Sequence, residues 1–124
     1  MLMDTSQMPT PDADTYPPRL AEVLPGLPGD ILGGLRDADR MDLADQVADL
    51  RIRSRCRCGD AFCGSFYTAT KRGPAPGLET VPLSSDIILD VIDGAIVFVE
   101  VLNRPDVREG LDGAGFSGTR EPLP

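Results

Sequence analysis

The dipeptide Asp93-Gly94, placed between two runs of β-branched residues, limits the fold of this chain more than any other feature. The run DIILDVI occupies residues 86–92 and the run AIVFVEVL occupies residues 95–102. Asp-Gly favours a two-residue type I′ turn, in which both turn residues adopt positive φ angles. The pattern therefore predicts an antiparallel hairpin over residues 86–102, and its apolar content places it at the centre of the sheet.

Both faces of this hairpin are expected to be apolar. The expected pairs are Val91 with Ile96, Leu89 with Phe98, and Ile88 with Val99. Asp90 and Glu100 are the main polar interruptions. Extended apolar surface has to be covered, because exposed patches of this kind are typical of interaction sites. Either helices cover both faces, or one face meets another protein.

Three short helices are expected before the sheet. Residues 18–24 begin with proline and are stopped by Pro25-Gly26, and residues 28–35 form a second short helix. The third spans residues 40–50 with Asp39 as its cap, because apolar and acidic side chains fall on opposite sides at 100° per residue. A final helical turn is expected over residues 103–109.

A second hairpin is expected between the helices and residue 70. Residues 51–57 alternate strictly, and residues 65–70 form the return strand after a turn at Gly59-Asp60. Residues 71–82 are rich in proline and glycine and are predicted to be a loop. The whole pattern predicts an α+β fold, with N-terminal short helices packed on a four-stranded antiparallel β-meander.

The domain limits follow from the ends of these patterns. Residues 1–17 are expected to be a disordered N-terminal tail, residues 18–110 a single α+β domain, and residues 111–124 a flexible C-terminal tail. A chain of 124 residues is long enough for one modest core.

The charge balance limits the possible partners. The formal net charge is −8, which disfavours nucleic acid and anionic membranes as partners. The start of the chain lacks the features of a secretory signal, and the longest apolar run is residues 95–99. A cytoplasmic location is therefore expected.

Three cysteines within eight positions form the main candidate site. With Cys58 opposite Cys63 and Cys56 opposite Ser65, all three sulfurs project from one sheet face within a few ångströms of each other. Such crowding suits a soft metal ion, but zinc prefers four ligands and this chain has no histidine. Asp60, Asp86 or a dimer partner would have to supply the fourth ligand.

Three other interpretations of the cysteines are open. In the favoured interpretation, the cysteines are buried free thiols that act as small apolar residues. This interpretation implies no cofactor. Alternatively, Cys58 and Cys63 form a disulfide, or one thiol is reactive because Arg55 and Arg57 stabilise its thiolate. The strand alternation, however, directs those arginines to the other face.

Four arginines form the second candidate site. Arg51, Arg53, Arg55 and Arg57 are expected on one strand face. In one interpretation, they bind a carboxylate-rich or phosphate-bearing partner. In a second interpretation, their charge keeps a solvated edge strand from pairing with other strands. The second interpretation is favoured because the rest of the molecule is acidic.

The chain resembles an uncharacterised group of small proteins from high-G+C bacteria. The resemblance covers roughly residues 20–110 and rests on a CxCGDxxCxxFYT block that begins at Cys56 and on the hairpin around Asp93-Gly94. It implies no function.

No complete catalytic motif is present, so an enzyme is not the favoured class. The sequence favours a non-enzymatic binding or regulatory module that acts through protein–protein contact, with a partner protein or as a homodimer. The alternative is a small metal-stabilised or redox-sensing domain built around Cys56, Cys58 and Cys63.

Overall fold

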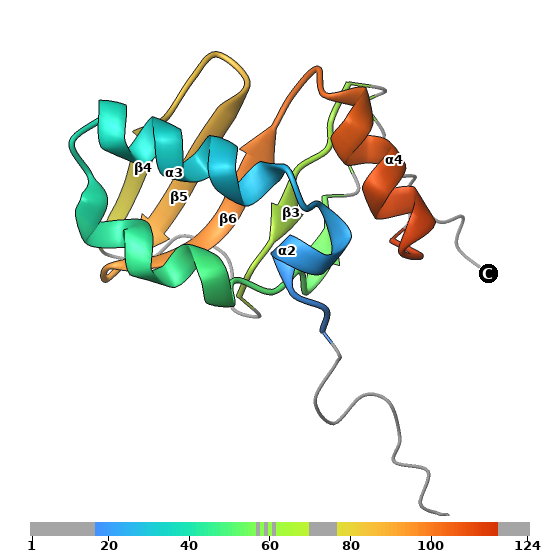
Figure 1. Ribbon diagram of the computed structural model, residues 1–124, viewed down its shortest axis with the longest axis horizontal. Coiled ribbons are helices and arrows are strands. Elements are labelled where there is room, and N and C mark those ends of the chain that lie inside the picture. The colour runs from blue at the N-terminus through green and yellow to red at the C-terminus, as the bar shows by residue number, and fades with distance from the viewer. Residues whose placement is uncertain (1–16, 57, 59, 61, 70–76, 117–124) are drawn as a thin grey trace, which may run out of the picture.

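The computed structural model describes residues 17–116, except residues 57, 59, 61 and 70–76 (Figure 1). The predicted N-terminal tail, apart from Pro17, and most of the predicted C-terminal tail lie outside the described residues. The elements, in chain order, are helices α2 (Leu20–Val23) and α3 (Leu27–Asp37), the 3₁₀ helix η1 (Met41–Asp49), strands β2 (Ser54–Arg55), β3 (Phe66–Tyr67), β4 (Leu78–Pro82), β5 (Ile87–Ile92) and β6 (Ala95–Val101), and helix α4 (Pro105–Gly113).

The strands form one antiparallel sheet in the order β2-β3-β6-β5-β4. The predicted α+β class is confirmed, but the four-stranded meander is wrong. The sheet has five strands, and β6 pairs with β3 although β4 and β5 lie between them in the sequence. The helices are also not all N-terminal to the strands, because α4 follows the last strand, β6.

The fifth strand, β4, lies inside the segment predicted to be a loop. It pairs with β5 along its length, from Leu78 opposite Ile92 to Pro82 opposite Ile88. Val81 is its one buried residue. A sheet edge accepts proline and a mostly exposed strand, since only one side of the strand has to be paired. The proline-rich composition was therefore a poor guide here.

The central hairpin has the predicted turn. Asp93 and Gly94 adopt φ angles of 52° and 81°, as a type I′ turn requires. The predicted register holds only next to the turn, where Val91 faces Ile96. Beyond it the partner of Leu89 is Val99 instead of Phe98, because Val97 is an extra residue in β6.

This bulge determines which side chains of β6 enter the core. An extra residue shifts the alternation by one position. Ile96, Val99 and Val101 are all buried as a result, whereas Phe98 and Glu100 turn to the opposite face. The predicted partner of Ile88 was Val99, but the structure pairs Ile88 with Glu100.

The helices cover one face of the sheet. Figure 1 shows α3 and η1 in front of β4, β5 and β6, with α2 and α4 toward the β2–β3 side. Leu27, Ile31 and Leu35 of α3 are buried together with Leu89 and Val99 of the sheet. Among the described residues, no helix covers the opposite face.

The predicted helix over residues 40–50 is present as the 3₁₀ helix η1. Its buried residues Leu43 and Val47 confirm the predicted apolar side. Asp39 does not cap it: this residue has a φ angle of 60° in the turn after α3, and Arg40 occupies the N-cap without a side-chain capping bond to the helix backbone.

Helix α4 is longer than the single turn that was expected. The predicted domain limit at residue 110 lies inside it, and Leu111 is fully buried beyond that limit. Phe116 also packs against the core. In the part of the chain that the structure describes, no helix is long and apolar enough to cross a membrane.

Candidate thiol site

The β2–β3 hairpin and its connection position the three cysteines. Cys56 follows β2, and its backbone N–H donates to the carbonyl of Ser65 at 2.8 Å. Cys63 forms an antiparallel bridge with Leu102, just after β6. Its N–H donates to the carbonyl of Asp60 at 3.2 Å. Cys56 and Cys63 are therefore held by backbone bonds to two different parts of the sheet.

The three sulfur atoms lie together. The Sγ atoms of Cys56, Cys58 and Cys63 are within 4.8 Å of one another. All three are free thiols; Cys58 is exposed, and the other two are half-buried. The prediction that the three sulfurs cluster is confirmed, and the exposed Cys58 leaves the cluster open to solvent on one side.

The thiols differ in acidity. Burial raises the pKa of Cys56 to about 11 although a hydrogen bond from the Cys58 backbone opposes it, and the side chain of Cys58 and the charge of Cys63 raise it further. Burial also disfavours the thiolate of Cys63, but hydrogen bonds from Ser65 and from the other two thiols outweigh it and lower its pKa. Cys63 is thus the first of these two thiols to ionise, whereas Cys56 keeps its proton and serves as a donor.

Ser65 is the residue that the sequence interpretation missed. It was expected only as the residue opposite Cys56. Its hydroxyl accepts a hydrogen bond from the Val101 N–H at 2.9 Å and is buried. The spacing of Cys63 and Ser65 by two residues, which places both on one strand face, was the available signal.

The described arginines of residues 51–57 have three different surroundings. Arg51 donates to the carbonyl of Pro17 at 2.6 Å, and Arg53 is exposed. Arg55 is buried and donates to Asp112 and Phe116. Strict alternation is not kept, since Ile52 and Arg55 are both buried. Arg57 lies outside the described residues.

The donor set fits a soft metal ion in kind and falls short of zinc in number. Thiolates are the ligands that soft ions prefer, and structural zinc takes four ligands. Within the described residues, neither Asp60 nor Asp86 brings a carboxylate into the cluster. The chain supplies no fourth cysteine and no histidine.

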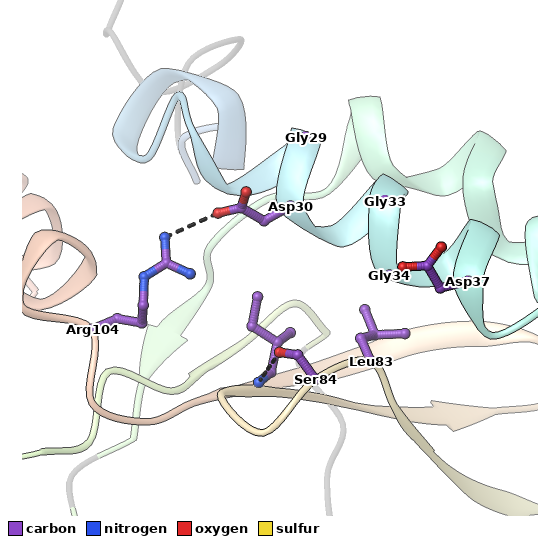
Figure 2. A pocket seen from close by; sticks show the side chains of 9 residues that line it. Gly29, Asp30, Gly33, Gly34, Asp37, Leu83, Ser84 and Arg104 are labelled. Atoms are coloured by element: carbon purple, nitrogen blue, oxygen red, sulfur yellow. Dashed lines mark hydrogen bonds and ion pairs between the residues drawn. The ribbon is translucent and has the colours of Figure 1, made fainter.

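A depression lies between α3 and the β4–β5 connection, with a volume of about 400 Å³. Figure 2 shows Arg104 directed toward Asp30 at one end and Leu83 close to Gly34 at the other. Arg104 is paired with Asp30 and with Asp106, both at 3.0 Å. Because Arg104, the one cation among its described lining residues, is already paired with two carboxylates, this depression is a weaker candidate than the thiol cluster.

Comparisons of the chain with protein-family models, with curated proteins and with solved structures find no match. The resemblance to an uncharacterised bacterial group stays a prediction.

Proposed function

We propose that this domain is a non-enzymatic module that binds a thiophilic metal ion through Cys56, Cys58 and Cys63. The observation that supports it is the approach of three sulfurs to within 4.8 Å of one another. Free cysteines packed as apolar residues have no need to converge, and convergence on a partly exposed site is typical of ligation.

The surroundings of the sulfurs favour binding over catalysis. The side chains that hydrogen-bond the Cys56 and Cys63 thiols are the other thiols and Ser65. A nucleophilic cysteine is usually paired with a base such as histidine, which this chain lacks. Cys63 therefore acts as the first thiolate to meet a metal ion, and the remaining thiols lose their protons on coordination.

The test is a titration of the reduced protein with Cd²⁺, Zn²⁺ and Cu⁺, followed by thiolate-to-metal absorption and elemental analysis. We expect one ion per chain and weaker binding after Cys56→Ser, Cys58→Ser or Cys63→Ser. Met41→Ser is the matched control, because it removes an exposed sulfur outside the cluster. The absence of binding by every ion, or full binding by all three cysteine variants, would contradict the proposal.

A second candidate function is protein–protein contact through the uncovered face of the sheet. Cross-strand pairing places Tyr67, Phe98 and Asp90 in one row on this face, and Ile88 and Glu100 in the next. The rings of Tyr67 and Phe98 lie 4.5 Å apart. Two carboxylates among apolar residues favour a partner with an apolar centre and basic side chains over a second copy of this acidic chain.

Selection of binding peptides from a random library tests this contact. We expect enriched peptides to combine aromatic and basic residues, and to lose affinity when Asp90→Lys and Glu100→Lys are combined. Asp45→Lys, an exposed position on η1, is the control for the change in charge. A stable dimer in sedimentation at micromolar concentration would show instead that a second copy occupies the face.

A further inference from the structure

The sequence limits the thiolate and imidazole donors that the thiol site can offer. The whole chain contains three cysteines and no histidine, and all three cysteine sulfurs are in the cluster. An ion that needs four thiolate or imidazole ligands is therefore left incomplete by this chain. An ion that is complete with three sulfurs is fully coordinated.

Ions that take three ligands differ in the net charge that they leave on the occupied site. Three thiolates around a monovalent ion leave two negative charges, and around a divalent ion they leave one. Arg55, which precedes Cys56, is buried in a contact with Asp112 and Phe116 and is not free to pair with the cluster. A half-buried anion is costly in a protein whose net charge is already −8. Three thiolates around a trivalent centre leave no net charge.

The spacing of the sulfurs is compatible with a three-coordinate pyramidal centre. Metal–sulfur bonds of about 2.3 Å place neighbouring sulfurs roughly 3.5–3.8 Å apart. The observed separations, at most 4.8 Å, require a contraction of only about one ångström. Cys58 is exposed, whereas Cys56 donates its backbone N–H to Ser65 and Cys63 forms a bridge with Leu102.

We infer that the thiol site is selective for a trivalent metalloid hydroxide of the arsenite or antimonite class. This inference rests on the proposed metal-binding function and names its ligand. In the reaction, three bonds from the metalloid to hydroxyl oxygen break and three bonds to sulfur form. Each thiol proton leaves in a water molecule, so three waters are released and nothing is oxidised or reduced.

Arsenite and a phenylarsenical of the same oxidation state provide a matched pair of probes. Arsenite takes three thiols, whereas the phenyl group leaves room for two. After binding, alkylation should modify no cysteine in the arsenite complex and one cysteine in the phenylarsenical complex. The intact arsenite complex should gain the mass of one arsenic atom less three protons.

Single substitutions then test the contribution of each cysteine. Each single Cys→Ser change should weaken arsenite binding by about a hundredfold or more, because one arm of a three-armed chelate is lost. Asp60→Asn should change nothing, since its carboxylate is outside the cluster. One free thiol in the arsenite complex, or loss of arsenite binding in Asp60→Asn, would overturn the inference.

Competition with zinc distinguishes this inference from the proposal that it rests on. We expect arsenite to displace zinc at equal micromolar concentrations. If Zn²⁺ or Cd²⁺ binds tightly and arsenite does not, the selectivity is wrong while the metal-binding function stands. If no ion binds, both are wrong.

Discussion

The guanidinium of Arg55 donates a hydrogen bond of 2.5 Å to the carboxylate of Asp112. A second bond, of 2.9 Å, reaches the carbonyl of Phe116. The Arg55 side chain is only 3% exposed, whereas that of Asp112 is 62% exposed. Because Arg55 immediately precedes Cys56, the pair ties the thiol-bearing segment to the C-terminal end of α4. A cation at this end also interacts favourably with the helix dipole.

We expect Asp112→Ala to lower the free energy of unfolding by about 1–3 kcal/mol, because a buried cation loses its anionic partner. Urea unfolding measures this loss. Asp45→Ala, an exposed carboxylate on η1, is the control and should change stability by no more than about 0.5 kcal/mol. Equal stabilities of the two variants would show that the ion pair contributes nothing.

The Arg55 contact also shows where the sequence interpretation fails. Arginine at an alternating position is expected in solvent, and nothing local indicates that a helix 57 residues later supplies its acceptor. The Asp93-Gly94 turn, by contrast, was predictable because its φ angles depend on two adjacent residues. This turn is specified by neighbouring residues, whereas the partner of Arg55 is distant in the sequence.

The same distinction explains the register and the thiol site. The bulge at Val97 determines which side chains of β6 face the helices, and a hairpin that is apolar on both faces gave no signal of its position. The three sulfurs were predictable as a cluster, because one hairpin brings them together. The bridge of Cys63 to Leu102 was not, since it requires β6 to pair with β3 across the sheet.

The two faces of β5 should respond differently to a charge. Leu89 is fully buried under the helices, so Leu89→Asp should unfold the domain at a cost of several kcal/mol. Ile88 is next in the strand but points to the uncovered face, and Ile88→Asp should retain the fold. Circular dichroism and thermal unfolding measure both. A folded Leu89→Asp variant would mean that the core is misplaced.

Gln46 connects η1 to the central hairpin. Its side-chain N–H donates to the carbonyl of Gly94 at 2.5 Å, and its side-chain oxygen accepts from the N–H of Ile96 at 2.8 Å. We expect Gln46→Ala to reduce stability by about 1–2 kcal/mol, since two backbone groups lose a partner. The Ile96 amide should also exchange with deuterium faster. Unchanged exchange at Ile96 would contradict this role.

Gly34 allows α3 to approach the β4–β5 connection closely. A Cβ atom placed on Gly34 would lie 2.6 Å from the Cβ of Leu83. Gly34→Ala should therefore destabilise the domain, although alanine is the better helix former. Gly33→Ala is the matched control, because a Cβ there meets nothing within 4 Å. Gly33→Ala should be neutral or stabilising, and equal losses in both variants would rule out the close-contact explanation.

The unequal thiols predict both reactivity and alkaline stability. Cys63, with its lowered pKa, should be alkylated by iodoacetamide at a lower pH than Cys56, whose pKa is raised to about 11. Mass spectrometry of digested protein identifies the modified residue. Cys56 modified before Cys63 at neutral pH would contradict the assignment of the first thiolate.

The raised pKa of Cys56 also has a consequence for folding. A thiol whose pKa is higher in the folded state favours folding while it is protonated. Its contribution is complete below the ordinary thiol pKa of 9.0 and is lost progressively as the pH rises toward about 11. Cys56→Ser removes this titration, so its melting temperature should fall less than that of the wild type over this interval. If the melting temperatures of the two proteins fell equally over this pH range, Cys56 would not have a raised pKa.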